Sequence, residues 1–322
     1  MGGGTARGEP SRFTLPRPAR SVLGLVWPPP DEAALRAAVA GRVVLITGAS
    51  RGIGAASARR LATVGAVVLL VARSTADLER VRTDIHGSGG EAHAYSADLA
   101  DRMQVATLLT RLREDHDHVD VVISNAGKSI RRSMAESYNR FHDVTRTIDL
   151  NYLGPVQLLL GLLPAMRARR TGHLVNVSSV SADIPAPFWA TYTGSKMAFE
   201  AWLRCVAPEL RADGVATTSI HFPLVHTEMS APISFYRYLP GMTADEAADA
   251  VCRAIAYRPR LMSPWWSRAA GAVSAAAQPA ADALMTAYYQ GQRSGRLQAA
   301  GKAARQAAER ITGSPPRPRA GR

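Results

Sequence analysis

The chain has 322 residues, of which 47% are hydrophobic and 20% charged, and its formal net charge is +13. This composition is typical of a globular protein with one large α/β domain or two small ones, and the presence of only two cysteines, Cys205 and Cys252, excludes a disulfide framework. Both cysteines lie in apolar helical patterns that predict buried thiols. Because we find neither a signal-peptide pattern nor an apolar run of about 18 residues, we expect a cytoplasmic protein.

The positive charge is concentrated at the two ends of the chain. Residues 1–30 carry four Arg against one Glu, and residues 291–322 carry seven Arg and one Lys against one Glu. Both segments are rich in Gly, Pro, Ala and Arg, which predicts flexible basic tails. The simplest interpretation is a solubilising role, and contact with anionic lipid or a nucleotide-bearing ligand stays an alternative. We expect no specific nucleic-acid binding.

The first predicted strand runs into a glycine-rich turn. A short helix is expected over residues 31–40 with Asp31 as its N-cap, and the β-branched run 43–46 predicts a buried parallel strand. A helix is expected after the turn, to about residue 64. In this context the glycines let the backbone approach a pyrophosphate at the helix N-terminus. The predicted dinucleotide-phosphate site consists of Thr47, Gly48, Ser50, Arg51, Gly52, Ile53 and Gly54.

The end of the second strand, residues 67–71, is expected to meet the adenosine ribose of the cofactor. An acidic residue there would accept the 2′-hydroxyl, but Ala72 and Arg73 occupy the position, and Arg51 lies in the glycine turn. Two guanidiniums suit a 2′-phosphate better than a hydroxyl. We therefore predict NADPH in preference to NADH; the alternative is that one arginine is a surface residue and that the selectivity is loose.

The remaining chain alternates between strand and helix patterns. Further strands are expected over 92–96, 119–124, 174–177 and 216–222, and helices over 75–85, 101–114, 136–166 and 192–210. With the first two, these make six strands, which predicts an α/β fold with one doubly wound, Rossmann-type parallel sheet. Ligands of such sheets bind at the carboxyl ends of the strands, where the polar and glycine motifs of this chain lie.

Tyr192 and Lys196 are four residues apart in a predicted helix and therefore share one face. A free phenol has a pKa of about 10, and a nearby ammonium lowers the pKa toward neutrality. Ser179, just after the strand 174–177, can hold a carbonyl oxygen against the phenol. Such a pair also occurs on solvated helix faces, but its place beside the cofactor site favours a proton relay acting on a carbonyl or an alcohol.

Together these motifs resemble the short-chain dehydrogenase/reductase family over residues 40–262. The matching positions are Thr47-Gly48-x-x-x-Gly52-x-Gly54, Asp98, Asn125-Ala126-Gly127, Asn151, Ser179 and Tyr192-x-x-x-Lys196. The resemblance implies that Tyr192 is the general acid/base and that Ser179 holds the substrate oxygen. It implies that Lys196 binds the nicotinamide ribose and lowers the Tyr192 pKa, and that Asn151 positions a water.

The same resemblance implies further cofactor contacts. Asp98 would contact the adenine, and Asn125, with Ala126 and Gly127, would support the cofactor side of the sheet. After the sixth strand the usual Pro-Gly is replaced by Pro223-Leu224, which implies a stiffer entry to the substrate loop. The positions that would contact the cofactor there are Pro223, Val225 and Thr227.

A narrower resemblance concerns the substrate. Residues 125–133, 140–143, 150–154 and 223–232 are similar to those of bacterial short-chain-type fatty acyl-CoA reductases, although His226 and Glu228 depart from that pattern. The resemblance implies NADPH-dependent reduction of a long-chain acyl-CoA to a fatty aldehyde. Alternatives are a ketone or aldehyde reductase or an alcohol dehydrogenase on another lipophilic substrate, and a non-catalytic cofactor-binding scaffold.

Two segments are candidates for binding such a substrate. Lys128, Arg131 and Arg132 can hold CoA phosphates, or can form a solvated basic turn. The aromatic segment 233–242 is a candidate for a lid over a lipid chain or over any hydrophobic substrate. The histidines show no metal-ligand spacing, and we expect no metal.

We therefore predict that the chain has four segments: a flexible basic segment 1–30, a catalytic domain 31–262, a helical extension 263–290 and a flexible basic tail 291–322. The extension begins near Trp265-Trp266 and is rich in Ala. It can pack against the core or a partner subunit, or lie peripherally on a membrane. The family resemblance implies a homo-oligomer.

Overall fold

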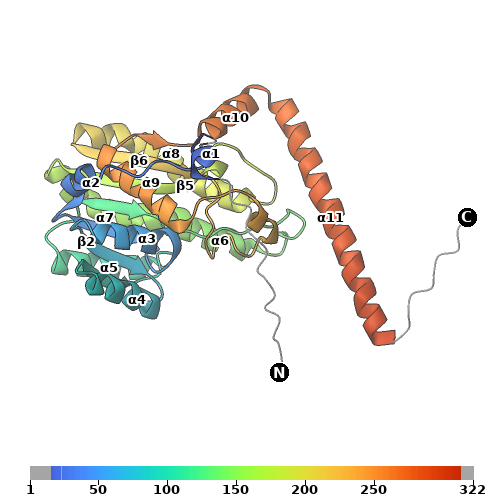
Figure 1. Cartoon of the computed structure of the whole chain (residues 1–322), viewed down its shortest axis with the longest axis horizontal. Helices are drawn as coiled ribbons and strands as arrows, with labels where there is room; N and C mark the ends of the chain where they lie inside the picture. The colour runs from blue at the N-terminus through green and yellow to red at the C-terminus, as the bar shows by residue number, and fades with distance from the viewer. Residues whose placement is uncertain (1–15, 23, 313–322) are drawn as a thin grey trace, which may run out of the picture. The chain divides into compact units, whose positions relative to one another are not determined.

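The structure is a computed structural model that describes residues 16–22 and 24–312, and Figure 1 shows its helices and strands. The chain divides into two compact units, Met1–Ala270 and Gly271–Arg322, and the sheet lies in the first. No helix of the described residues has both the length and the apolar character that crossing a membrane requires.

A seven-stranded sheet has the order β3-β2-β1-β4-β5-β6-β7, and every neighbouring pair is parallel. The chain starts in the middle, runs outward to β3, returns to β4 beside β1 and runs outward again, so the predicted doubly wound α/β fold is confirmed. The strands are β1 (Val43–Thr47), β2 (Val67–Ala72), β3 (Glu91–Ser96), β4 (Val121–Ser124), β5 (Gly172–Ser179), β6 (Val215–Phe222) and β7 (Leu261–Met262).

Helices cover both faces of this sheet, so successive residues of a strand are buried in different clusters. Val44 and Ile46 pack with one set of helices, whereas Leu45 between them packs with the other. The first set is α2 (Glu32–Val39), α3 (Gly52–Ala62), α4 (Thr75–Gly87) and α9 (Ala244–Tyr257). The second set is α5 (Arg102–Asp115), α7 (Gly154–Ala168) and α8 (Ala190–Ala212).

The long helix expected over residues 136–166 begins later than expected and contains a π-helical turn. The chain forms turns up to residue 140, then α6 (Phe141–Ile148), a π-helical turn η1 (Asp149–Leu153) and α7. Pro155 has no N–H to donate to a carbonyl of the preceding turn. A Cβ at Gly154 would lie 1.9 Å from the carbonyl oxygen of Leu99, so the backbone approaches the loop after β3 at a distance that only glycine permits.

The expectations for the N-terminal segment need correction. Part of the segment predicted to be flexible forms α1 (Arg17–Val22), and Arg20 on this helix makes two hydrogen bonds of 2.7 and 2.8 Å to Glu246 of α9. Val26 is also buried in the core. Residues 1–15 lie outside the described part of the chain.

At the other end, the sequence missed β7, which has only two residues. It is followed by α10 (Trp265–Ala276) and by α11 (Gln278–Thr312), which continues through much of the segment predicted to be a flexible tail from residue 291. The many Ala, Gln and Arg residues there are strong helix formers. Residues 313–322 lie outside the described part. Cys252 is buried, but Cys205 is exposed on α8, contrary to expectation.

Candidate active site

A cavity of about 780 Å³ lies at the carboxyl ends of the central strands. Residues that directly follow β1, β2, β4, β5 and β6 line it, as the position of ligand sites in parallel sheets predicts. The lining residues include 50–53, 72–74, 125–129, 178–181 and 222–225.

The turn after β1 is shaped for close backbone contact. Gly48 has a φ of +67°, and a Cβ at Gly54 would lie 2.3 Å from the Gly48 carbonyl oxygen, so α3 packs directly on the turn. The helix begins without a side-chain cap, and its first residues, Gly52 and Ile53, line the cavity. Its first N–H groups are therefore available to an anion, as a dinucleotide pyrophosphate requires.

Thr47 and Asn125 fix this turn to the end of β4. Thr47 Oγ1 accepts hydrogen bonds of 3.0 Å from the N–H groups of Asn125 and Ala126. Asn125 Nδ2 donates to the carbonyl oxygens of Thr47 at 2.9 Å and Gly48 at 3.2 Å. Thr47 is buried and does not line the cavity, so it supports the turn from beneath.

Two arginines lie at the β2 end of the cavity. Arg73 is 71% exposed and lies 3.6 Å from Asp98 Oδ2, whereas Arg51 pairs with Asp77 at 3.0 Å and with Glu228. Both arginines line the cavity, and neither Ala72 nor Ser74 beside Arg73 brings a carboxylate to this end of β2. Two guanidiniums therefore lie at this end of the cavity, each paired with at least one carboxylate of the chain.

Asn151 lies on the π-helical turn η1 and is 1% exposed. Its Oδ1 accepts from the Lys128 N–H at 2.8 Å, and its Nδ2 donates to the Lys128 carbonyl at 3.0 Å and to Ser195 Oγ at 2.9 Å. A Cβ added at Gly127 would lie 3.4 Å from both Asn151 Oδ1 and Lys196 Nζ. The structure thus brings Asn151 and Lys196 together beside Gly127.

Ser179, Tyr192 and Lys196 all line the cavity. Burial raises the pKa of Tyr192, and a hydrogen bond with the Ser179 side chain lowers that pKa in part. Burial lowers the pKa of Lys196 to about 8, while Glu200 acts in the opposite direction. Lys196 Nζ donates to the Val177 carbonyl at 2.9 Å. The pKa of Tyr192 is therefore raised in this structure, where Lys196 was expected to lower it, because burial outweighs the Ser179 hydrogen bond.

Sequence reasoning missed a buried network behind the lysine. His221 Nδ1 lies 2.9 Å from Asp183 Oδ2, and its Nε2 lies 3.6 Å from Glu200 Oε2. Ser263 and Ser267 each donate to Asp183 Oδ2 at 2.9 Å. The two carboxylates outweigh burial and raise the pKa of His221. This network ties the segment after Ser179 to β6, α8 and α10.

The substrate side of the cavity is aromatic. Trp189 and Tyr236 line it, and their rings stack with centroids 6.3 Å apart. Tyr236 belongs to a short 3-10 helix, Ser234–Tyr238, inside the segment predicted as a lid. Beside it, the Arg131 guanidinium lies 4.3 Å from the Phe188 ring centroid, and the Arg132 N–H donates to the Phe188 carbonyl at 2.7 Å.

Most of the predicted site residues therefore line one cavity, including Lys128, Pro223, Val225 and Thr227. Those that do not line it are Thr47, Gly54, Asp98, Asn151, Arg131 and Arg132. Thr47, Gly54 and Asn151 lie directly behind lining residues, and Asp98 reaches the rim through Arg73. Arg131 and Arg132 contact the substrate-side residue Phe188 instead.

Comparison with known proteins gives a consistent result. Residues 42–235 match the family model for short chain dehydrogenases. A fatty acyl-CoA reductase of Acinetobacter baylyi is 43% identical over 79% of this chain and 86% of its own length, and one of Mycobacterium tuberculosis is 41% identical over 73% and 79%. A solved metagenomic short-chain oxidoreductase in complex with NADP aligns with a TM-score of 0.61 and 30% identity, over 70% of this chain and 99% of its own.

Proposed function

The chain belongs to the short-chain dehydrogenase family of oxidoreductases, and from this premise we propose that it reduces long-chain fatty acyl-CoA thioesters to fatty aldehydes with NADPH. One observation carries the proposal: a single cavity joins the uncapped N-terminus of α3 to Ser179, Tyr192 and Lys196 and to an aromatic substrate side. The names of the two reductase relatives support the choice of substrate.

The residues of the cavity fit a dinucleotide. The N–H groups at Gly52 and Ile53 would bind the pyrophosphate, and Lys196 would bind the nicotinamide ribose. For the 2′-phosphate of NADPH, Arg51 and Arg73 offer guanidiniums at the end of β2. The NADP in the solved relative supports this preference. When bound, the nicotinamide supplies the hydride that the reduction requires.

The chain's own residues would handle the proton and hold the substrate. Ser179 and Tyr192, which share a hydrogen bond, would hold the thioester carbonyl oxygen between their hydroxyls. A phenol with an ordinary pKa of about 10 is protonated at neutral pH, and burial raises the pKa of Tyr192 further, so Tyr192 holds the proton that it would donate to that oxygen. The resulting hemithioacetal collapses to aldehyde and free thiol. Asn151 holds Lys128 and, through Ser195, the start of α8 in place.

A substrate panel tests the proposal. Palmitoyl-CoA, palmitaldehyde and a medium-chain ketone are each incubated with NADPH, and NADPH loss is followed together with free thiol. We expect palmitoyl-CoA to consume NADPH and to release thiol. Turnover of the aldehyde or ketone without thiol release from palmitoyl-CoA would instead assign the chain to the carbonyl reductases, and NADPH binding without any turnover would assign it to the scaffolds.

A further part of the proposal concerns the oligomeric state of the enzyme and its contact with lipid. We propose a homo-oligomer in the cytoplasm that makes peripheral contact with lipid through its C-terminal helices. Large exposed apolar side chains on these helices support the lipid contact: Trp265, Val273 and Leu284 are 64–66% exposed. Sedimentation with anionic vesicles, compared with neutral ones, tests it; equal recovery in the supernatant with and without vesicles would refute it.

A further inference from the structure

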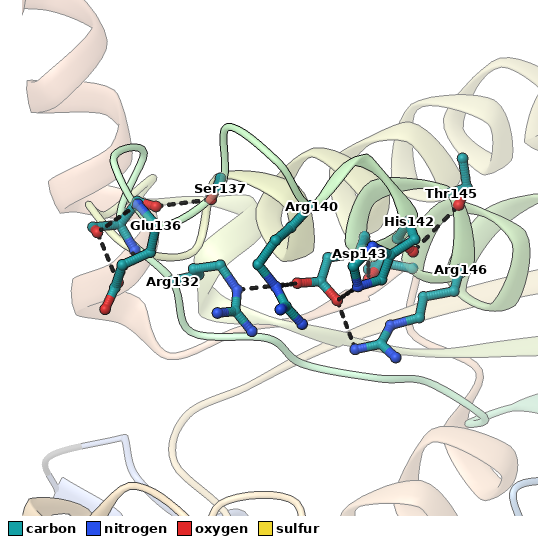
Figure 2. A network of polar contacts seen from close by, with 10 residues as sticks. Arg132, Glu136, Ser137, Arg140, His142, Asp143, Thr145 and Arg146 are labelled. Carbon is teal, nitrogen blue, oxygen red and sulfur yellow. Dashed lines mark hydrogen bonds and ion pairs between the residues drawn. The ribbon is translucent and has the colours of Figure 1, made fainter.

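Three arginines converge on one buried carboxylate beside the substrate side of the cavity. The Nε atoms of Arg132 and Arg140 lie 3.0 and 2.9 Å from Asp143 Oδ2, and Arg146 lies 2.6 Å from Asp143 Oδ1. Figure 2 shows the three side chains meeting at Asp143 from the loop before α6 and from α6 itself. The Asp143 side chain is 6% exposed, whereas the arginine side chains are 29%, 40% and 45% exposed.

The cluster has more positive charge than its internal partners neutralise. Residues 128–146 contain one Lys and four Arg, against the carboxylates of Glu136 and Asp143. Glu136 accepts hydrogen bonds from the N–H and the hydroxyl of Ser133, at 2.9 and 2.7 Å. Each guanidinium has five N–H donors in a planar fork, and one carboxylate cannot satisfy three such groups. Donors on the exposed sides of the arginines are therefore directed to solvent or to a ligand.

The cluster adjoins the cavity at two places. The backbone N–H of Arg132 donates to the Phe188 carbonyl at 2.7 Å, next to the cavity-lining Trp189. Lys128 lines the cavity and precedes Arg132 by four residues in the loop after β4. A ligand whose reacting end lies at Tyr192 can therefore extend a charged end to the arginines.

We propose that Arg132, Arg140 and Arg146 form a subsite for the phosphate groups of the coenzyme A nucleotide. Asp143 would fix the positions of the three guanidiniums by pairing with each of them. This inference rests on the proposed function, since it concerns the carrier of the acyl thioester. The long pantetheine arm separates the thioester from the phosphates, so the two ends of the substrate need separate sites. Arginine forks match phosphate oxygens in a bidentate manner and are more weakly hydrated than lysine.

The test compares two substrates with the same thioester. Palmitoyl-CoA carries the nucleotide, and S-palmitoyl-pantetheine lacks every phosphate. In the full chain we expect Arg140→Gln and Arg146→Gln each to raise the KM for palmitoyl-CoA by about tenfold, the loss of one charge-assisted hydrogen bond, and to leave kcat unchanged. The KM for the pantetheine thioester should not change, and Arg146→Lys should restore only part of the affinity, because lysine lacks the bidentate fork.

Arg59→Gln is the matched control. The Arg59 side chain is 46% exposed and lies 2.7 Å from Asp84, so it resembles Arg146 in exposure and in having an aspartate partner, but it lies on α3 and outside the arginine cluster. Thermal unfolding of each variant checks that the fold is intact. Equal KM increases for both thioesters, or no increase for palmitoyl-CoA, would overturn the subsite.

A binding measurement separates this inference from the proposed function. Calorimetry with CoA is performed on protein saturated with NADP, so that the nucleotide cannot occupy the cofactor site. We expect Arg146→Gln to bind CoA about tenfold more weakly than the wild type and Arg59→Gln to bind it equally. Equal affinity in all three proteins, or no binding, refutes the subsite even where thioester reduction is observed. Weakened binding in Arg146→Gln supports it even where reduction fails.

Discussion

At the scale of single residues, burial controls the protonation of the site. It raises the pKa of the Tyr192 phenol and lowers the pKa of the Lys196 ammonium to about 8. These are the directions expected when a charged form loses its hydration. The Ser179 hydroxyl opposes the first effect and Glu200 opposes the second, so the neighbours of both groups reduce the effect of burial.

The cofactor preference can be tested at Arg73. Its side chain lies at the end of β2 and is 71% exposed, so its removal leaves no buried charge unpaired. We expect Arg73→Ala to raise the KM for NADPH by about tenfold or more, because a charge-assisted contact to the 2′-phosphate is lost. The KM for NADH, measured in the same preparations, serves as the control. Equal increases for both cofactors would contradict the phosphate contact.

The contribution of His221 to the free energy of unfolding should depend on pH. Its folded pKa is raised above 6.5, so the imidazolium stabilises the fold fully below pH 6.5, and this stabilisation is lost as the pH rises through the folded pKa. The loss of unfolding free energy in His221→Gln, measured by urea denaturation, should therefore be larger at pH 5.5 than at pH 9.

His173 is the opposite case and serves as the control. It is fully buried, and burial lowers its pKa to about 3, so the unfolded chain binds the proton more readily below pH 6.5. The loss of unfolding free energy in His173→Gln should therefore become smaller as the pH falls. If both variants show the same pH dependence, the charged state assigned to His221 is wrong.

At the scale of elements, the sequence predicted the strands whose signal is local. The runs at β1 and β2 are β-branched and flanked by turn residues, so their positions followed from the sequence. β7 has two residues and exists because it pairs with β6, an interaction that no local pattern carries. The π-helical turn between α6 and α7 likewise lies next to a close approach of Gly154 to Leu99, far away in the sequence.

The site residues likewise divide into those with a local sequence signal and those that depend on contacts between distant elements. Tyr192 and Lys196 were predicted because their spacing places them on one helix face, and the structure brings both to the cavity. His221 was missed because its partners Asp183 and Glu200 come from other elements. The arginine cluster was predicted only in part, since the approach of Arg140 and Arg146 to Arg132 depends on where α6 begins.

The close backbone contact at the start of α7 can be tested by adding a single methyl group at Gly154. At Gly154 a Cβ would lie 1.9 Å from a backbone oxygen, so Gly154→Ala should destabilise the fold by about 1–3 kcal/mol. At Gly194 on α8 a Cβ would meet nothing within 4 Å, and Gly194→Ala should be neutral or stabilising by up to about 1 kcal/mol. Urea denaturation of both variants checks this; equal stability would contradict the close contact.

At the scale of the whole molecule, three helices of the first unit each have a large exposed apolar side chain. Phe141 on α6, Leu160 on α7 and Met197 on α8 are 73%, 61% and 42% exposed. Exposed apolar groups of this size are typical of an interface between subunits. We therefore expect these helices to contribute to the contact of the proposed homo-oligomer.

Light scattering coupled to size exclusion tests this assignment. Leu160→Glu should reduce the molar mass to that of one chain, because burying an unpaired carboxylate in an interface is costly. Leu284→Glu changes a side chain of similar exposure, 64%, on α11, and should leave the mass unchanged. An oligomer that survives Leu160→Glu would place the interface elsewhere.

The most direct test of the account is the stoichiometry of thiol release in wild-type protein and in Tyr192→Phe. With palmitoyl-CoA, the wild type should release one thiol for each NADPH that it oxidises in the first step. Tyr192→Phe should reduce the rate by about 10²–10⁴-fold while NADPH affinity, measured by fluorescence, is unchanged. Thiol release by Tyr192→Phe at the wild-type rate, or NADPH oxidation by the wild type without thiol, would contradict it.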